Sequence, residues 1–362
     1  MSYALIGCGR IAANHIKAAV KNGLRIAAVC DVIPQKAEAL LKNRGLDASS
    51  SIRRYADYKL MLSQVRPQLV AIATESGKHA KIALDCIGAG ASLIIEKPMA
   101  LSIKDADAII AAGKEKGVKV CACHQNRFNL SVQRLRAALE GGRFGKLSHG
   151  AVHVRWSRNE AYYKQAPWRG TWEEDGGALM NQSIHGIDLL RWMLGDDIEE
   201  VFAYASNRLH PYIEAEDIGI AVVKFKSGAT ATIEGTTNVY PENLEETLYI
   251  FGENGTVKLG GKSLNAIDIF EFSDKCEAGK GLEAGFIEET ENVYGNGHAP
   301  LYKDVISALE NDREPYIDAE AGRRALELVL AIYRSAREGR PVRLPLEDFS
   351  TREMTGIGWG TN

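Results

Sequence analysis

Two side chains of this sequence could handle a proton or a developing negative charge near neutral pH. The imidazole of His185 has an ordinary pKa of about 6.5 and can accept a proton from a hydroxyl group. The ammonium group of Lys97 can stabilise an alkoxide or relay its proton. Together they suit the oxidation of a secondary alcohol, in which a base removes the hydroxyl proton while a hydride leaves for an acceptor.

The segment 168–194 must position His185, and it ends in an amphipathic helix. At 3.6 residues per turn, Asn181, His185 and Asp188 lie on one helical face, within about 60° of each other. This spacing places Asn181 and Asp188 beside the imidazole, and Asp188 is also a candidate for a structural ion pair with nearby Arg191. A histidine on an apolar helix face is more often a packed core residue, so the helix alone does not establish catalysis.

Lys97 follows a short buried strand over residues 92–95. Open α/β sheets bind their ligands at the carboxyl ends of the strands, which is where Lys97 is expected. Pro98 fixes the backbone after it, and the Lys97–Pro98 peptide bond is a candidate for the cis form. The alternative is an ordinary solvated lysine at a strand end.

Residues 3–31 predict a phosphate-binding βαβ unit. A strand over residues 3–6 meets Gly7-Cys8-Gly9, and an Ala-rich helix then leads to a second strand. Gly7 permits the sharp turn, Gly9 lets the backbone approach a pyrophosphate, and Ala12 allows close packing of helix and strand. The helix N-terminus offers N–H groups and a positive dipole end to phosphate.

Asp31 closes the second strand, about 20 residues after the glycine turn, where a carboxylate accepts hydrogen bonds from an adenosine ribose. It would repel the 2′-phosphate of NADP, and no arginine or lysine directly follows it, so the predicted cofactor is NAD. An ordinary βαβ unit would leave Asp31 unexplained. For His79 a capping or packing role is an equal alternative. The predicted cofactor-binding residues are Gly7, Gly9, Arg10, Ile11, Asp31, Thr74, His79, Glu96, Lys97 and Gln125.

The pattern of apolar runs predicts an α/β protein with two domains, because 362 residues exceed the usual size of one core. Strands and helices alternate up to residue 123, which indicates a Rossmann doubly wound parallel sheet of five or six strands. Alternating runs with glycine turns then predict an α+β domain with an open, mostly antiparallel sheet. We expect residues 1–123 to bind the dinucleotide and residues 124–362 to serve substrate binding and oligomerisation. Residues 262–296 are glycine-rich and could not be assigned.

Composition and charge limit the kinds of partner and the cellular compartment that we expect. The net charge of −3 is spread over scattered residues, so neither nucleic acid nor a membrane surface is expected as a partner. No segment approaches ~18 uninterrupted apolar residues, and we expect a cytoplasmic protein. Five cysteines lie in or beside predicted strands and helices, and Cys276 stands alone in a polar region. Buried, reduced thiols are the better interpretation, and no metal site is predicted.

The whole chain resembles the Gfo/Idh/MocA oxidoreductase family. The resemblance depends on the dinucleotide turn, on Glu96-Lys97-Pro98 and on residues 176–188 (GGALMNQSIHGID). Within the family, residues 123–129 (CHQNRFN) and 162–172 (YYKQAPWRGTW) resemble the WlbA group. These are UDP-N-acetylglucosaminuronate 3-dehydrogenases that make diacetylated amino-sugar uronic acids for surface polysaccharides such as lipopolysaccharide.

The family pattern has an Asp, a His four residues later and the lysine of the Glu-Lys-Pro motif as catalytic groups. Lys97 and His185 match it, whereas Asn181 stands at the Asp position and can only hydrogen-bond. The resemblance thus implies catalysis by Lys97 and His185 with Asn181 as an orienting residue. It also implies NAD as cofactor and a homo-oligomer, a dimer or tetramer, formed through the C-terminal sheet. By position alone, His124, Asn126 and Arg127 are expected to border the nicotinamide.

The predicted substrate is a UDP-linked N-acetylated hexuronic acid, and the predicted position of oxidation is a ring hydroxyl, that of C3. Cations interleaved with aromatic residues in the segment 155–172 suit a ligand with a diphosphate, a carboxylate and flat rings. The same segment could instead be an oligomer contact or a solvated loop. The predicted substrate-binding residues are Lys97, Arg155, Tyr163, Lys164, Arg169, Asn181 and His185.

Three other functions remain open from the sequence. One is a different NAD-dependent sugar or polyol dehydrogenase of the same family. Another is an NAD-dependent glycosidase that oxidises its substrate transiently and returns the hydride. The third is a non-catalytic dinucleotide-binding regulator, against which the presence of Lys97 and His185 argues.

Overall fold

A computed structural model describes residues 1–46, 51–274, 284–290 and 295–358. The chain forms two compact units, the first made of Met1–His124 with His298–Arg323, and the second of Gln125–Gly297 with Arg324–Asn362. A single division after residue 123 therefore does not describe the chain, because residues 298–323 pack in the first unit. Cys276 lies outside the described residues.

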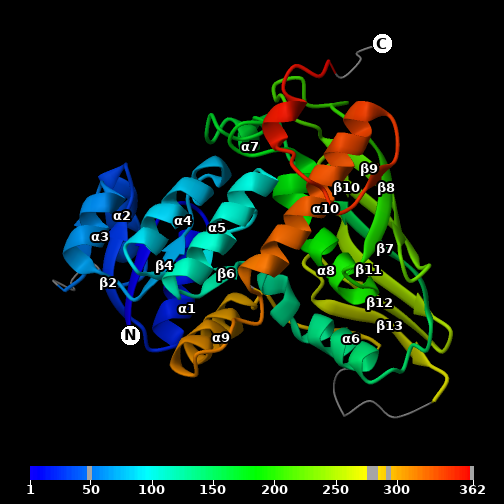
Figure 1. The fold of residues 1–362 in the computed structure, drawn as a ribbon, viewed down its shortest axis with the longest axis horizontal. Coiled ribbons are helices and arrows are strands. Elements are labelled where there is room, and N and C mark those ends of the chain that lie inside the picture. The colour runs from blue at the N-terminus through cyan, green and yellow to red at the C-terminus, as the bar shows by residue number, and fades with distance from the viewer. Residues whose placement is uncertain (47–50, 275–283, 291–294, 359–362) are drawn as a thin grey trace. The chain divides into compact units, whose positions relative to one another are not determined.

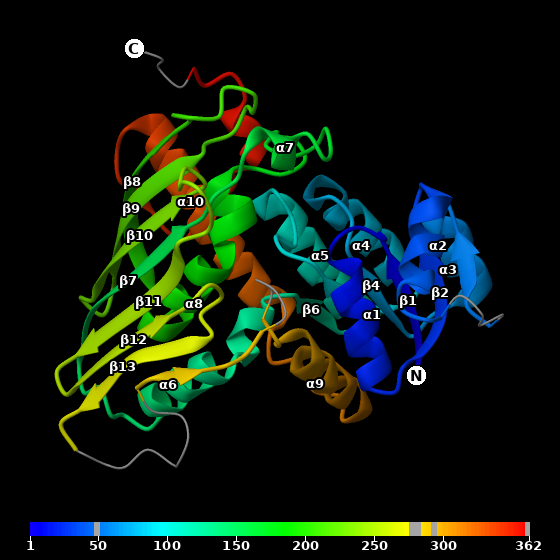
Figure 2. The same ribbon diagram turned by 180° about the vertical axis from the view of Figure 1, so that it is seen from behind.

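The first unit is built around a six-stranded parallel sheet in the order β3-β2-β1-β4-β5-β6, which confirms the predicted doubly wound fold. Its strands are β1 (Ser2–Ile6), β2 (Arg25–Cys30), β3 (Arg53–Tyr55), β4 (Leu69–Ile72), β5 (Ser92–Ile95) and β6 (Val120–Ala122). Its helices are α1 (Ala12–Lys21), α2 (Pro34–Lys42), α3 (Tyr58–Val65), α4 (His79–Gly88), α5 (Ile103–Lys116) and α9 (His298–Glu310). Figure 1 shows α4 and α5 before this sheet, and the reverse view in Figure 2 shows α1 and α9 before it.

Local chemistry explains these elements. Every residue of β4 and β5 is buried, as expected for parallel strands covered by helices on both faces. Helix α5 begins where the Ser102 side chain accepts from the amide of Asp105, and it ends at Gly117 in the left-handed conformation. The sheet order reverses at β1, so the turn after β1 lies at the crevice where such sheets bind ligands.

The second unit contains a nine-stranded sheet in the order β14-β13-β12-β11-β7-β10-β9-β8-β15. All of its pairs are antiparallel except β7 with β10, which confirms the predicted mostly antiparallel sheet. Its strands are β7 (Leu147–Arg155), β8 (Ile198–Ser206), β9 (Ile218–Phe225), β10 (Thr230–Thr236), β11 (Glu245–Gly252), β12 (Gly255–Gly260), β13 (Ala266–Phe272), β14 (Phe286–Ile287) and β15 (Val342–Arg343). Its helical elements are α6 (Leu130–Glu140), α7 (Glu160–Tyr163), the π-turn η3 (Ala178–Ser183), α8 (Ile184–Leu194) and most of α10 (Ala319–Glu338).

The two faces of this sheet differ. Residues alternate between buried and exposed along β9 and β10, as expected for a sheet with one covered face. Helix α8 packs against β7 and β11 on the covered face. Strands β13 and β14 lie in the glycine-rich region 262–296, which the sequence did not assign.

Five cysteines of the described residues are free and buried, which confirms the prediction of reduced thiols for Cys8, Cys30, Cys86, Cys121 and Cys123. Among the described helices, none is long and apolar enough to cross a membrane.

Candidate active site

The glycine turn after β1 has the shape that a bound pyrophosphate requires. Gly7 has φ of 93°, and a Cβ atom there would lie 2.4 Å from the carbonyl oxygen of Ala73, so only glycine fits. A Cβ at Gly9 would meet nothing within 4 Å, which leaves open space beside the backbone. Helix α1 has no side-chain cap at Ile11, so its first N–H groups can bind phosphate.

Asp31 meets this turn, as the spacing in the sequence predicts. Its Oδ2 accepts from the amide of Cys8 at 2.8 Å, and its Oδ1 accepts from the amide of Ile33 at 2.8 Å. A carboxylate oxygen can accept more than one hydrogen bond, so both oxygens retain capacity for ribose hydroxyls. The turn, the helix end and the acid together fit NAD.

His79 connects the end of β4 to the segment that carries Lys97. Its Nδ1 lies 2.8 Å from the carbonyl oxygen of Pro98, and its Nε2 lies 3.1 Å from that of Thr74. Burial lowers the pKa of this imidazole, against the effect of the two carbonyl groups. These contacts favour the packing role for His79. The Lys97–Pro98 peptide bond is cis.

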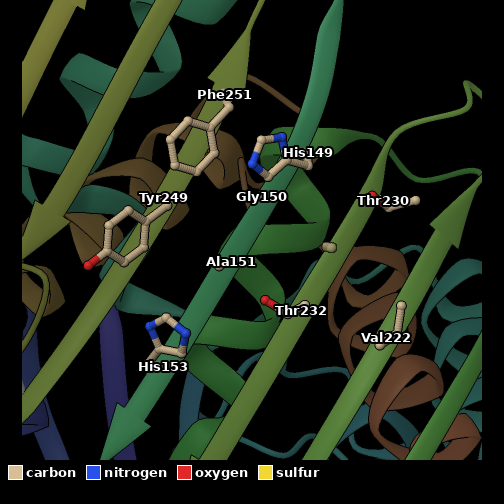
Figure 3. A pocket seen from close by; sticks show the side chains of 10 residues that line it. His149, Gly150, Ala151, His153, Val222, Thr230, Thr232, Tyr249 and Phe251 are labelled. Carbon is tan, nitrogen blue, oxygen red and sulfur yellow. The ribbon is translucent and has the colours of Figure 1, made fainter.

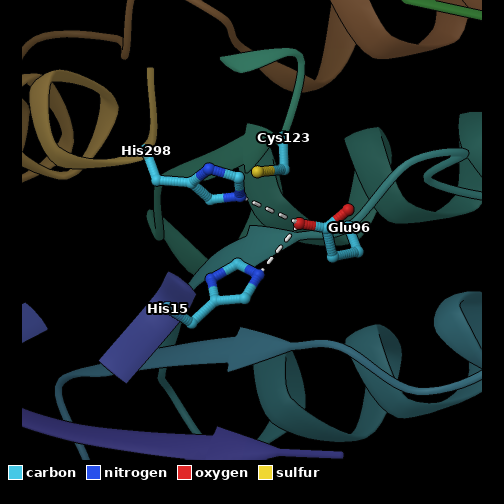
Figure 4. A group of neighbouring side chains, drawn as sticks. All are labelled: His15, Glu96, Cys123 and His298. Carbon is cyan, nitrogen blue, oxygen red and sulfur yellow. Dashed lines mark hydrogen bonds and ion pairs between the residues drawn. The ribbon is translucent and has the colours of Figure 1, made fainter. Parts of the chain in front are cut away.

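Glu96, the residue before Lys97, lies in a buried group of side chains that includes His15 and His298 (Figure 4). Glu96 Oε1 lies 2.9 Å from His15 Nε2 and 3.6 Å from His298 Nε2, and its Oε2 accepts from the Lys97 amide at 3.2 Å. Burial alone would raise the pKa of the Glu96 carboxyl, but the hydrogen bond from His15 and the nearby imidazole of His298 hold that pKa well below its usual value. The ionised carboxylate thus fixes the backbone from which the Lys97 side chain departs.

Cys123 lies in the same cluster, and the four side chains could be mistaken for metal ligands. The other ring nitrogen of His15, Nδ1, bonds the hydroxyl of Tyr302 at 2.7 Å. His15 Nε2 faces Glu96 Oε1, so the two atoms share a proton instead of turning toward a common ion. This geometry is that of a hydrogen-bond network.

In the second unit, the helix predicted around His185 begins differently. Residues 178–183 form the π-turn, and the α-helix α8 starts only at Ile184. Asn181 therefore stands in the π-turn and His185 in α8, so the predicted common α-helical face of the two residues is wrong. The cause is the i→i+5 bonding of a π-helix, which changes the angle per residue.

Asn181 and His185 have hydrogen-bond partners in different parts of the second unit. The Asn181 amide nitrogen donates to Asp175 Oδ1, and its oxygen accepts from Gln182. The His185 side chain is 7% exposed, and its Nε2 lies 3.4 Å from Nε2 of Gln125, a predicted cofactor residue. The orienting role of Asn181 toward His185 stays a prediction.

Asp188 forms the predicted ion pair with Arg191, at 3.2 Å. Its stronger partner is Arg127, whose Nε and Nη2 donate to the two carboxylate oxygens at 2.7 and 2.6 Å. All three side chains are buried. Arg127 was expected at the nicotinamide, but its guanidinium is committed to a bidentate structural bond.

The predicted substrate residues of the segment 155–172 do not form one group. Arg155 is bound to Glu234 and Glu245, at 2.6 and 2.7 Å, so its charge is compensated on the sheet. Lys164 is exposed and pairs with Glu160 one helical turn away. Tyr163 is buried, with its hydroxyl 3.3 Å from that of Thr237.

Arg169 instead belongs to a network that reaches the π-turn. Its Nη1 donates to the hydroxyl of Tyr162 at 2.6 Å, and its guanidinium stacks on the Tyr162 and Trp168 rings. Gln182 donates to the same hydroxyl at 3.0 Å and accepts from Arg158 at 2.8 Å. Two guanidinium groups thus converge, through Tyr162 and Gln182, on the turn that carries Asn181.

Sequence reasoning missed Gln182 and Asp175 as members of this site, and it left Arg158 out of the predicted substrate-binding residues. Arg158 was visible as a cation among aromatic residues, and it stacks on Trp156 and Tyr162. For Gln182 and Asp175 the only available signal was their closeness in sequence to His185. Their partners are set by the tertiary fold.

The fold and the site define an NAD-binding oxidoreductase. Models of the oxidoreductase family match the chain twice, as the NAD-binding Rossmann fold over residues 1–124 and as the C-terminal alpha/beta domain over residues 136–344. The chain belongs to the Gfo/Idh/MocA oxidoreductase family. It is an NAD-dependent dehydrogenase that acts on a CH–OH group.

Known relatives include sugar and polyol dehydrogenases. The D-apiose dehydrogenase of Paraburkholderia graminis is 29% identical over 99% of this chain and 93% of its own length. The myo-inositol 2-dehydrogenase of Thermotoga maritima is 25% identical over 95% of this chain and 98% of its own.

Two solved structures are more similar in sequence. The WlbA dehydrogenase of Bordetella pertussis, in complex with NADH and UDP-GlcNAcA, is 37% identical with a TM-score of 0.83, covering 95% of this chain and 99% of its own. The WlbA dehydrogenase of Chromobacterium violaceum, in the same kind of complex, is 37% identical with a TM-score of 0.86, covering 96% of each chain.

Proposed function

We propose that this protein oxidises a ring hydroxyl, at C3, of a UDP-linked N-acetylated hexuronic acid, in the synthesis of a sugar for surface polysaccharide. The observation that carries the proposal is the convergence of Arg158 and Arg169 on the π-turn before His185. A neutral polyol gives no reason for two guanidinium groups there, whereas a diphosphate and a carboxylate do. The likeness to two WlbA dehydrogenases complexed with UDP-GlcNAcA supports the same substrate class.

In this reaction NAD, when bound, accepts the hydride. The chain supplies the proton chemistry: the imidazole of His185 takes the proton of the reacting hydroxyl. The Lys97 ammonium stabilises negative charge on the same oxygen, and the Glu96 network keeps the lysine backbone fixed.

The test is NADH formation with UDP-N-acetylglucosaminuronate, UDP-N-acetylglucosamine and free N-acetylglucosamine, with D-apiose and myo-inositol as further arms. The uronate should exceed the others by at least about tenfold in kcat/KM, because a substrate without the carboxylate leaves the guanidinium group that binds it unpaired. Equal turnover of the two UDP-sugars, or best turnover of an uncharged sugar or polyol, would contradict the proposal. A return of the hydride with loss of a leaving group would show the glycosidase alternative.

A variant pair sharpens this test. Arg169→Met should raise KM for the UDP-uronate and leave kcat/KM for a free sugar nearly unchanged. Arg143→Met is the matched control, because the guanidinium of Arg143 also stacks on two aromatic rings, those of Phe270 and Phe272, and is held by Asp274 at 2.8 Å. An equal effect of both variants would remove Arg169 from the proposed site.

We further propose that the open face of the nine-stranded sheet binds a second copy of the chain. Figure 3 shows this face, from which Tyr249, Phe251, His149 and His153 project. The rings of His149 and Phe251 stack at 4.3 Å, and Ile220 and Val222 are 51% and 52% exposed. Such a patch is typical of a protein interface.

Val222→Asp should shift the protein to a smaller species in light scattering, since an isologous interface would bring the new charge close to its copy. Val20→Asp, at an exposed valine of α1, is the control. An unchanged mass with Val222→Asp would contradict this interface.

A further inference from the structure

The first amides of the π-turn have acceptors from distant parts of the second unit. A helical segment leaves its first N–H groups without partners inside the helix, and buried N–H groups need partners. Here Glu216 and Tyr333 supply them. The bonds are Gly177 N to Tyr333 Oη (3.3 Å), Met180 N to Tyr333 Oη (3.1 Å), Leu179 N to Glu216 Oε1 (2.8 Å) and Ala178 N to the carbonyl oxygen of Glu216 (3.0 Å).

The two side chains also hold each other. The Tyr333 hydroxyl donates to Glu216 Oε1 at 2.9 Å while it accepts the two amides, so its full hydrogen-bonding capacity is used. Both side chains are fully buried, and the Tyr333 ring packs edge-on against Trp172 with ring centroids 5.1 Å apart.

The sequence of the turn is adapted to this arrangement. A Cβ atom at Gly177 would lie 1.8 Å from Glu216 Oε2, so a glycine is needed for the carboxyl group to reach the turn. Burial raises the pKa of Glu216 to about 8, although the bonds from Leu179 and Tyr333 act in the opposite direction. The carboxyl is therefore neutral at neutral pH, and glutamine is a close mimic of it.

We propose that Glu216 and Tyr333 are positioning residues of the active site. They hold the π-turn in its i→i+5 form and thereby set where Asn181 stands and where α8, with His185 in its first turn, begins. π-Helical segments are rare, and they occur frequently at functional sites. This inference rests on the catalytic role proposed for His185.

The test compares Tyr333→Phe with Ser335→Ala in the full-length enzyme. Ser335 is also buried on α10, but its hydroxyl accepts from the Ala203 amide at 3.1 Å and donates to the Arg340 carbonyl at 2.8 Å. Tyr333→Phe should lower kcat by roughly 10- to 100-fold through displacement of the turn, with KM and NAD affinity within about twofold of wild type. Ser335→Ala should be destabilised about as much as Tyr333→Phe but should keep the wild-type kcat.

Glu216 gives a second variant pair. Glu216→Gln should keep kcat close to wild type, because the amide can accept from Leu179 and Tyr333, whereas Glu216→Ala should resemble Tyr333→Phe. An equal decrease of kcat in Glu216→Gln and Glu216→Ala would contradict a role of the neutral carboxyl group.

Hydrogen exchange separates this inference from the proposed function. The peptide covering residues 177–183 should exchange faster in Tyr333→Phe than in wild type, and at the wild-type rate in Ser335→Ala. If His185→Asn keeps its turnover, the catalytic assignment fails even though the exchange result holds. If Tyr333→Phe lowers kcat no more than Ser335→Ala does, the positioning role is overturned.

Discussion

The glycine turn of the first unit and the π-turn of the second are both tight segments beside a ligand site, but they are held in different ways. The glycine turn is fixed by its own βαβ unit: the amide of Cys8 bonds Asp31, 23 residues later. The π-turn depends on Glu216 and Tyr333, which are 37 and 153 residues from the amides that they bind. The cofactor end is thus encoded locally, whereas the proposed base, His185, follows a turn that is held by the tertiary fold.

The largest expected effect comes from removing the proton chemistry. His185→Asn should lower kcat by roughly 10² to 10⁴ and leave NAD binding near normal, because loss of a general base acts on the transition state. Lys97→Met should do likewise. Steady-state kinetics and NAD titration measure both effects, and retention of most turnover by either variant would reassign that residue.

Cofactor choice tests the glycine-turn side of the comparison. Asp31 should give roughly a hundredfold preference for NAD over NADP, because its charge faces the 2′-phosphate. Asp31→Asn removes the charge and keeps one of the two acceptor oxygens, so it should reduce the preference for NAD over NADP. Comparable affinities of the wild-type enzyme for NAD and NADP in calorimetry would contradict the assignment.

Swapping the side chains of Asn181 and Asp175 tests how the π-turn is held. Asn181→Asp places a second carboxylate against Asp175 and should lower stability at neutral pH. The double variant Asp175→Asn/Asn181→Asp again pairs one amide with one carboxylate, so it should recover roughly 0.5–3 kcal/mol in denaturant unfolding. Strictly additive effects would mean that the two residues do not interact.

The last effect concerns the pH dependence of stability. Burial raises the folded-state pKa of Glu216 to about 8, above the ordinary 4.5, so the folded protein keeps a proton that the unfolded chain releases. Stability conferred by the neutral carboxyl should therefore fall as pH rises between these values, by up to ~1.4 kcal/mol per pH unit relative to Glu216→Gln. Equal pH dependence of the two proteins would show that Glu216 titrates normally.

The sequence predicted the features that depend on near neighbours. The glycine turn, Asp31 and the strand before Lys97 follow from local spacing, and the structure has them in place. The π-turn could not be predicted, since its i→i+5 bonding leaves no periodic signature and its supports are distant in sequence: Glu216, just before β9, and Tyr333 of α10.

Arg155 shows the same limit on the sheet. As a cation among aromatic residues it suggested an anion site, but strand register decides its partners. The pairing of β7 with β11 sets Glu245 directly opposite Arg155, and Glu234 of β10 lies within reach. Register across long loops cannot be derived from a single sequence.

The central claim is that the chain removes a hydride from a UDP-linked uronic acid with His185 as base. The most direct measurement is single-turnover NADH formation, with enzyme and NAD in excess over UDP-N-acetylglucosaminuronate, so that NADH that stays bound is also counted. We predict a rapid NADH signal in the wild-type enzyme and one slowed by roughly 10² or more in His185→Asn. No signal with the uronate, or the same rate in both proteins, would contradict the account.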